Sequence, residues 1–261
     1  MLVAMVAIPE PTPTASRGAT ARAVRELERR VLVELEPGAD LPSESALAHQ
    51  LGVSRLTVRE AIKALQARGL VDVGRGRRAR VAVLDARPIG DFFAAAIMRD
   101  PSRLLELTEV RRALEVHIAA LAAVNATRAS ITAMRAALDD MRATADSPDT
   151  GTLHAADVRF HEALAAASGN RLLDFLIEAI QVPLHASRLR SLRGHLARGG
   201  TVQDVVEQHE RIFARVVAHD ARGAAAAMAD HLAQTSRDLR AAFDLGADDA
   251  VGEAGALREK P

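Results

Sequence analysis

The chain has 261 residues, 49% of them hydrophobic, which predicts two domains with buried cores. It contains no cysteine, which excludes disulfides, thiolate metal sites and cysteine nucleophiles. Its net charge is zero, but residues 17–87 carry 14 Lys and Arg against 9 Asp and Glu, while residues 88–261 carry 20 against 24. The basic N-terminal part suits a domain that binds phosphates, and the acidic C-terminal part suits a domain that does not.

Residues 1–16 carry Pro, Thr and Ser without periodicity, and we expect them to form a disordered arm. The apolar run at 1–8 has no basic residue before it and is too short to span a bilayer. We therefore expect neither a secretory signal nor a membrane segment, and a cytoplasmic location.

The segment 17–84 has the pattern of a winged helix-turn-helix. Ser43 and Ser54 can each cap the start of a helix, and Gly69 can end one in a left-handed conformation. Two short β-branched runs flank a loop of glycine and arginine, which is typical of a hairpin. The predicted elements are helices at 19–35, 43–51 and 54–68 and a hairpin made by 70–73 and 80–84.

The rest of the chain is predicted to be helical. A linker is expected at 85–90, an all-α domain at 91–245 and a flexible tail at 246–261, and Pro183 should kink or split its helix. The predicted helices lie near 91–98, 101–124, 127–145, 151–167, 170–192, 201–218 and 220–243. The predicted fold is therefore mainly α, with a winged helix-turn-helix followed by a bundle of six or seven helices.

The helix at 54–68 has the chemistry of a DNA-recognition helix. Ser54 and Thr57 at its start can hold a phosphate, while Arg55 and Arg59 lie four residues apart on one face and can reach base edges. A solvated helix face is the plain alternative for one Arg pair, but the turn, the cap and a basic wing in register favour DNA. The predicted DNA-contacting residues are Ser43, Ser54, Arg55, Thr57, Arg59, Lys63, Arg75 and Arg77.

Four residues of the second half have the spacing of a metal site. Asp157 and His161 lie four apart on one predicted helix, and His209 and His231 lie on two later helices beside apolar residues. Three imidazoles and a carboxylate suit a divalent metal, Zn²⁺ first, with Ni²⁺ or Mn²⁺ as alternatives. Spacing alone leaves histidines without metal as the commoner alternative.

Residues 19–84 resemble the DNA-binding domain of the GntR family. The match lies in LPSE at 41–44, GVSR at 52–55 and TVR at 57–59. Ser45 and Leu56 depart from the family pattern and suggest an altered operator preference, while the Arg-rich wing suggests a larger electrostatic share of affinity.

Further segments, among them DVRFHEAL at 157–164 and EQHERIF at 207–213, resemble the FCD effector domain of FadR-like members. That resemblance implies a divalent metal held by Asp157, His161, His209 and His231. It places Arg111 near the effector pocket, where pairing with a ligand carboxylate and a structural salt bridge are equal alternatives. His154 is expected at the surface or behind the ligands. No functional role is expected for His49, His117, His185, His195 and His219.

We therefore expect a homodimeric transcriptional regulator, not an enzyme, that binds two-fold operator DNA and responds to a small organic acid at the metal. Repression relieved by ligand is the commoner behaviour of the family. The alternatives are a metal-dependent hydrolase and a non-specific DNA-binding protein without effector. The hydrolase needs a general base beside the metal, and Glu162 lies about 100° around the helix from His161.

Overall fold

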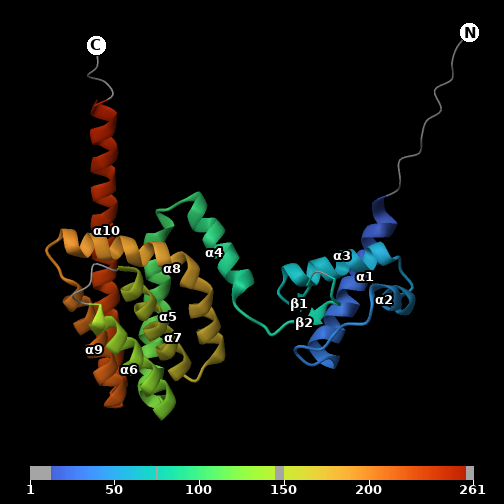
Figure 1. Cartoon of the computed structure of the whole chain (residues 1–261), viewed down its shortest axis with the longest axis horizontal. Helices are drawn as coiled ribbons and strands as arrows, with labels where there is room; N and C mark the ends of the chain where they lie inside the picture. The colour runs from blue at the N-terminus through green and yellow to red at the C-terminus, as the bar shows by residue number, and fades with distance from the viewer. Residues whose placement is uncertain (1–12, 75, 145–149, 257–261) are drawn as a thin grey trace, which may run out of the picture. The chain divides into compact units, whose positions relative to one another are not determined.

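The computed structural model describes residues 13–74, 76–144 and 150–256, and the chain divides into two compact units after Pro88 (Figure 1). The first unit contains a small hairpin and helices, and the second is helical. None of the helices in the described ranges is both long and apolar enough to cross a bilayer.

The first unit is a winged helix-turn-helix, as predicted. Ser43 Oγ accepts a hydrogen bond from Ala46 N at 3.2 Å, and Ser54 Oγ accepts one from Thr57 N at 3.0 Å, so both predicted caps are confirmed. Gly52 takes a φ of 63° in the turn between the two helices, a conformation that suits glycine. The elements are α1 (Pro13–Arg29), the π-helical turn η1 (Arg30–Glu34), α2 (Glu44–Leu51), α3 (Arg55–Ala67), β1 (Val71–Asp72) and β2 (Arg80–Val81).

The wing is held to this unit by short backbone pairing. Strands β1 and β2 are antiparallel, with Val71 opposite Val81, and both side chains are buried. A third segment extends the ladder, because Val81 N donates to Ala39 O at 2.8 Å. The core beneath it is apolar and contains Leu27, Leu47, Val58, Ala61 and Leu65. The hydrophobic faces of α1, α2 and α3 thus meet around α3 and leave its opposite face in solvent.

In the second unit, the described residues form seven helices, which decides between the six or seven expected. Several begin at side-chain caps, and Asn170 Oδ1 accepts from Leu172 N and Leu173 N. The helices are α4 (Arg87–Arg99), α5 (Arg103–Asn125), α6 (Arg128–Ala143), α7 (Thr150–Ala167), α8 (Arg171–Ala197), α9 (Val202–Val217) and α10 (Ala221–Ala256).

Helix α10 packs against α5, α8 and α9, and α7 packs against α5, α6 and α8 (Figure 1). The shared core contains Phe160, Leu164, Ile180, Met228 and Leu239, all at most 1% exposed. With so few aromatic residues, alanines bring the helices close together. A Cβ on Gly194 of α8 would lie 1.9 Å from the backbone oxygen of Asp238 on α10.

Four element boundaries differ from the expectation. Helix α1 begins at Pro13, inside the expected arm, and α4 begins at Arg87, inside the expected linker at 85–90. Proline is tolerated in the first turn of a helix because the missing N–H has no partner there anyway, so Pro13 and Pro88 start helices where they were expected to interrupt the chain. Helix α10 continues to Ala256, into the expected tail, and α8 is one helix through position 183, without the expected split.

Candidate DNA-binding surface and metal centre

Helix α3 presents the predicted recognition residues to solvent. The hydroxyls of Ser54 and Thr57 lie 2.9 Å apart and are exposed at its first turn. Arg55 is also exposed, and it forms no hydrogen bond or ion pair with another described residue. Leu56, at 66% exposed, adds an apolar contact to this face, which sequence reasoning noted only as a departure from the family pattern. The first turn of α3 thus offers hydroxyl, cationic and apolar groups together.

Arg59 is engaged in a pair that sequence reasoning missed. Its Nη2 lies 2.7 Å from Glu44 Oε2, and its Nε lies 3.2 Å from Glu44 Oε1, a bidentate geometry. These hydrogen bonds lower the pKa of Glu44 and raise that of Arg59. Glu44 belongs to the LPSE motif, so the motif contributes an orienting partner for an arginine of the recognition helix.

Lys63 and Arg77, two further predicted DNA contacts, are exposed. Lys63 Nζ lies 3.1 Å from Glu60 Oε1. In the wing, Arg77 and Arg78 are exposed, while Arg80 Nε donates to Asp40 Oδ1 at 3.0 Å. Arg75 lies outside the described residues.

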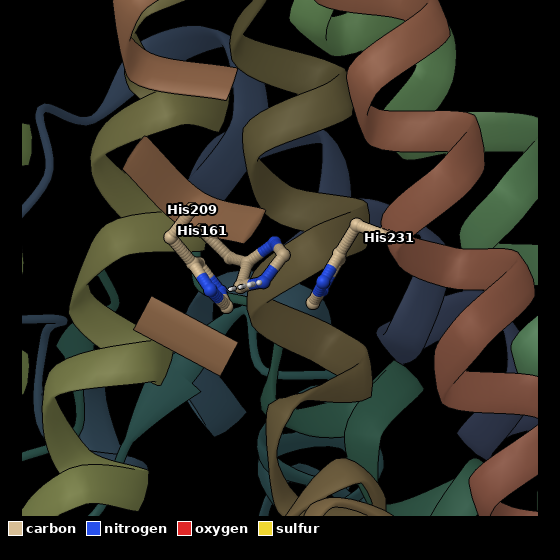
Figure 2. Close-up of side chains that lie close together, drawn as sticks. All are labelled: His161, His209 and His231. Carbon is tan, nitrogen blue, oxygen red and sulfur yellow. Dashed lines mark hydrogen bonds between the residues drawn. The ribbon is translucent and has the colours of Figure 1, made fainter. Parts of the chain in front are cut away.

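The three predicted histidine ligands converge in the core of the second unit. His161 on α7, His209 on α9 and His231 on α10 are 2%, 0% and 6% exposed, and their donor nitrogens lie within 4.8 Å of one another. Figure 2 shows His161 and His209 approaching from one side and His231 from the other, with the three rings converging. The Nε2 atoms of His161 and His209 are 3.3 Å apart. The fold therefore assembles residues that are up to 70 positions apart in the chain.

Asp157 also lies at this cluster. Its Oδ1 is 2.9 Å from His209 Nε2 and 3.7 Å from His161 Nε2, and its Oδ2 forms an ion pair with Arg188. Burial alone would raise the pKa of this carboxyl, but the Arg188 guanidinium and the two histidines hold it well below its ordinary value. Asp157 is therefore a carboxylate, the form that binds a metal.

Partners behind the histidines orient all three rings. His209 Nδ1 donates to the backbone oxygen of Val205 at 2.8 Å, and His231 Nδ1 donates to Gln208 Oε1 at 2.9 Å. His161 Nδ1 lies 2.5 Å from Glu115 Oε2. The contacts at Nδ1 lie on the outer side of each ring and direct each Nε2 into the cluster, which is the arrangement that metal-binding histidines use.

The ring charges follow from the same environment. Burial lowers the pKa of His161, and burial with the neighbouring His209 and His161 lowers that of His231 well below its ordinary value. The Nε2 atoms of His161 and His209 lie 3.3 Å apart, and Asp157 Oδ1 lies 2.9 Å from His209 Nε2, so these atoms are close enough together to share one cation. The residues present therefore fit a divalent metal with nitrogen and oxygen ligands.

Two buried arginines surround the cluster, and one was missed by sequence reasoning. Arg111 is 1% exposed and its Nε donates to Glu115 Oε1 at 2.6 Å, so the structural salt bridge that was one alternative for it is present. Arg188 Nη1 donates to Gln181 Oε1 at 2.8 Å, whereas its Nη2 is buried without a hydrogen-bond partner among the described residues. A buried N–H without an acceptor costs free energy, so this group is ready for an anionic ligand. Arg188 and Glu115 carry no motif of their own in the sequence; the one available signal is that Glu115 lies four residues after Arg111 on a helix.

A cavity of about 60 Å³ adjoins the cluster, and we call it the inner cavity. Arg111, Asp157, Arg188 and His231 line one end of it, and Asp238 lines the other. Seven residues separate His231 from Asp238 on α10, so these ends lie about 10 Å apart along the helix axis. The remaining lining residues are Leu153, His154, Leu189, Ser191, Leu192, His195, Val205, Gln208 and Thr235.

Two histidines without an expected role have structural partners. His195 is buried, and its Nδ1 lies 3.1 Å from Asp238 Oδ2, so it belongs to the far end of the inner cavity. His219 takes a φ of 55° between α9 and α10, and its Nδ1 donates to the backbone oxygen of Ala123. His49 and His117 are exposed, and the side chain of His185 lies outside the described part of the chain.

Comparisons with known proteins give consistent assignments for both units. Residues 19–81 match the model of bacterial regulatory proteins of the gntR family, and residues 106–234 match the FCD domain. The HTH-type transcriptional regulator LutR of Bacillus subtilis is 35% identical over 212 residues, covering 81% of this chain and 96% of that protein. The galactonate operon transcriptional repressor of Escherichia coli is 28% identical over 211 residues, covering 78% and 89%.

A solved structure of Streptococcus agalactiae GntR superposes with a TM-score of 0.66 at 28% identity. The aligned region covers 84% of this chain and 99% of the Streptococcus agalactiae chain. The similarity therefore extends over both units. The proteins to which the chain is similar are transcriptional regulators and not enzymes.

Proposed function

Because the chain belongs to the GntR family and carries the FCD domain of its FadR-like members, we propose that it represses transcription from a specific operator and releases it on binding a small organic acid at a divalent metal. The observation that carries this proposal is the buried cluster of three Nε2 atoms and the Asp157 carboxylate beside a cavity that holds a buried, unpaired guanidinium N–H. A protein that only bound DNA would have no use for such a cluster.

The DNA contact is assigned to α3 and the wing. Arg55 and Arg59 read base edges in the major groove, Ser43, Ser54 and Thr57 hold phosphates, and Lys63, Arg75 and Arg77 add backbone contacts. Two copies of the chain in a homodimer present two such units to a two-fold site in the cytoplasm.

The metal is assigned to His161, His209, His231 and Asp157, and Zn²⁺ suits this set best, with Ni²⁺ or Mn²⁺ as alternatives. When bound, the metal supplies a Lewis acid with open coordination positions for an acid's oxygen atoms. Arg188 orients the acid's carboxylate through its free Nη2, and Arg111 contributes positive charge from behind while it remains paired with Glu115.

The inner cavity limits the size of the acid. At about 10–15 Å³ for each water-sized occupant, a cavity of about 60 Å³ holds about four to six non-hydrogen atoms. Glycolate and lactate have this size, whereas a six-carbon sugar acid such as galactonate does not fit without widening the cavity. Ser191 and Thr235 among the lining residues offer hydroxyls that match a hydroxy acid. We therefore place the effector among short hydroxy acids.

The site lacks the parts of a hydrolase. Glu162, the carboxylate next to His161, lines a separate surface depression with Asp140, Arg159 and Glu178 and does not line the inner cavity. Among the described residues, the carboxylates at the cluster are Asp157, a proposed ligand, and Glu115, which is paired with Arg111. This arrangement leaves no general base for a metal-bound water.

The experiment is a titration of the full chain against the DNA upstream of its own gene and against random DNA of the same length. We expect specific binding that weakens at least tenfold in Arg55→Ala, with Arg25→Ala, an exposed arginine of α1, as the matched control. Equal affinity for both DNAs identifies a non-specific binder and refutes the proposal.

The effector arm uses lactate, glycolate and, as a control without a hydroxyl, propionate. We expect a hydroxy acid to weaken operator binding in metal-loaded protein and to have no effect on Arg188→Met or on protein stripped of metal. A reporter gene under the operator gives the sign: expression that rises when the regulator is deleted supports repression, and expression that falls contradicts it.

A further inference from the structure

A second hollow lies on the outside of the helical unit, between α9 and α10. It has a volume of about 860 Å³ and is open to solvent, and we call it the outer groove. Small residues line its floor, among them Ala214, Ala218, Ala226 and Ala227, so side chains leave the space between the two helices free. Its charged lining residues are Arg211, Arg215, Arg222, Arg237, Asp220 and Asp230.

The outer groove carries a positive charge. Four arginines face two aspartates, and Asp220 is already paired with Arg215 at 3.1 Å. Arg237 donates to Gln234, a neutral partner, and Arg211 is exposed outside the ion pairs of the described residues. Cationic walls on a concave surface concentrate anions and repel cations.

The outer groove and the inner cavity meet at two side chains. Gln208 of α9 and His231 of α10 line both hollows, and the hydrogen bond from His231 Nδ1 to Gln208 Oε1, at 2.9 Å, joins them. Gln234 also connects the two, because it lines the outer groove and donates to Asp238 Oδ1, which lines the inner cavity, at 2.8 Å. The two hollows are thus linked by hydrogen-bonded side chains of α9 and α10.

We propose that the outer groove is the entrance through which anionic ligands reach the buried metal centre, with Gln208 as the side chain that opens it. The arginines collect the anion, Gln208 turns away from His231, and the anion passes between α9 and α10 into the inner cavity. The His231 ring also contacts the rings of His161 and His209, at centroid distances of 5.5 and 4.6 Å, and these contacts do not depend on Gln208. This inference rests on the proposed function, because it assumes a metal at the histidine cluster.

The test is the rate at which two small ligands bind to Co²⁺ in the loaded full-length chain, followed by the visible absorption of the bound ion. Because bulky chelators exceed the size of the inner cavity, the probes are two small metal ligands, the azide anion and neutral imidazole, whose binding to the Co²⁺ changes its visible absorption in a stopped-flow experiment without removing it. In the double variant Arg211→Glu/Arg237→Glu, we expect the second-order rate with azide to fall about fivefold at low salt and the difference to vanish near 0.5 M salt. The rate with imidazole should change less than twofold, which also shows that the metal site is intact.

The control is Arg112→Glu/Arg193→Glu, which makes the same change of charge at exposed positions outside the groove. We expect it to change both rates less than twofold. Equal slowing of both ligands in the groove variant, equal slowing with azide in the control variant, or no slowing at all contradicts the proposal that the outer groove is the entrance. A chain that takes up no Co²⁺ refutes the metal centre and the entrance with it, whereas Co²⁺ uptake without charge selectivity refutes the entrance alone.

Discussion

Replacing Glu115 by glutamine removes one negative charge from a fully buried site without changing its shape. Glu115 is 2% exposed and contacts two groups, Arg111 Nε at 2.6 Å and His161 Nδ1 at 2.5 Å. Although burial opposes its ionisation, the Arg111 guanidinium and the His161 imidazole beside it hold the pKa of Glu115 well below its ordinary value, so it is a carboxylate at neutral pH. The substitution therefore leaves the Arg111 guanidinium charged, buried and without a counter-ion.

The loss of stability follows from that unpaired charge. Removing one partner of a buried ion pair costs about 3–5 kcal/mol, and the amide oxygen of glutamine recovers part of one hydrogen bond. We therefore expect Glu115→Gln to lower the free energy of unfolding of the metal-free helical unit by about 3 kcal/mol. For a unit of this size, that corresponds to a Tm lower by about 6–12 °C. Loss of the partner behind His161 should also weaken metal binding about 10–100-fold.

The assay is urea denaturation followed by far-UV circular dichroism, because the chain has no Trp or Tyr for fluorescence. Glu109→Gln, an exposed position on the same helix, is the matched control and should change stability by less than about 0.5 kcal/mol. The double variant Glu115→Gln/Arg111→Met removes both charges and should be more stable than Glu115→Gln alone. A loss below about 1 kcal/mol, or a double variant no more stable than the single one, would refute the reasoning.

Three further predictions concern other parts of the chain. Glu44→Gln frees Arg59 and removes a negative charge beside the DNA, so operator binding should tighten several-fold and depend more steeply on salt concentration. Because His231 is neutral when folded but takes up a proton near pH 6.5 when unfolded, the metal-free protein should lose about 1.4 kcal/mol per pH unit below that value, measured by urea denaturation. Gly194→Ala places a Cβ against the backbone of Asp238 and should cost at least about 2 kcal/mol, measured as a lower Tm.

Each of these predictions has a control and a contradicting result. Glu60→Gln removes a charge from α3 while leaving the Arg59 pair intact, and tightening equal to that of Glu44→Gln would mean that only net charge matters. Replacing His231 by glutamine should remove part of the pH dependence, and an unchanged slope between pH 6.5 and 5 would contradict its assignment. Ala197→Ser, at an exposed position of α8, should leave Tm unchanged, and a Gly194→Ala protein as stable as this control would mean that α8 and α10 move apart at little cost.

Local signals in the chain were sufficient for the DNA-binding unit. Ser43, Ser54 and Gly69 act within four residues of their own positions, as caps and as a helix end, so their effects can be read from neighbours in the sequence. The prolines were interpreted less well for the same reason. Pro13 and Pro88 lie in the first turns of α1 and α4, although these positions were expected to belong to an arm and a linker.

The histidine cluster shows where sequence reasoning ends. Asp157 and His161 share a face because they are four residues apart on one helix. Residue type and apolar neighbours suggested His209 and His231 as further ligands, but no local rule relates separate helices, so the resemblance to a family was needed to favour the set. Glu115, Arg188 and Gln208 were missed because buried and exposed polar residues look alike in a sequence, and their roles depend on which helices pack together.

The sequence by itself determined a basic helix-turn-helix with its wing, an all-helical second unit and four candidate ligands, because periodicity, caps and residue type are properties of short segments. The tertiary structure decided that the histidines present their Nε2 atoms to one point, that Arg59 is paired with Glu44, and that a small polar cavity adjoins the cluster. It also revealed the basic groove between α9 and α10. These features arise from contacts between residues far apart in the chain, where the direction of a side chain and its distance from water are set only when the helices pack.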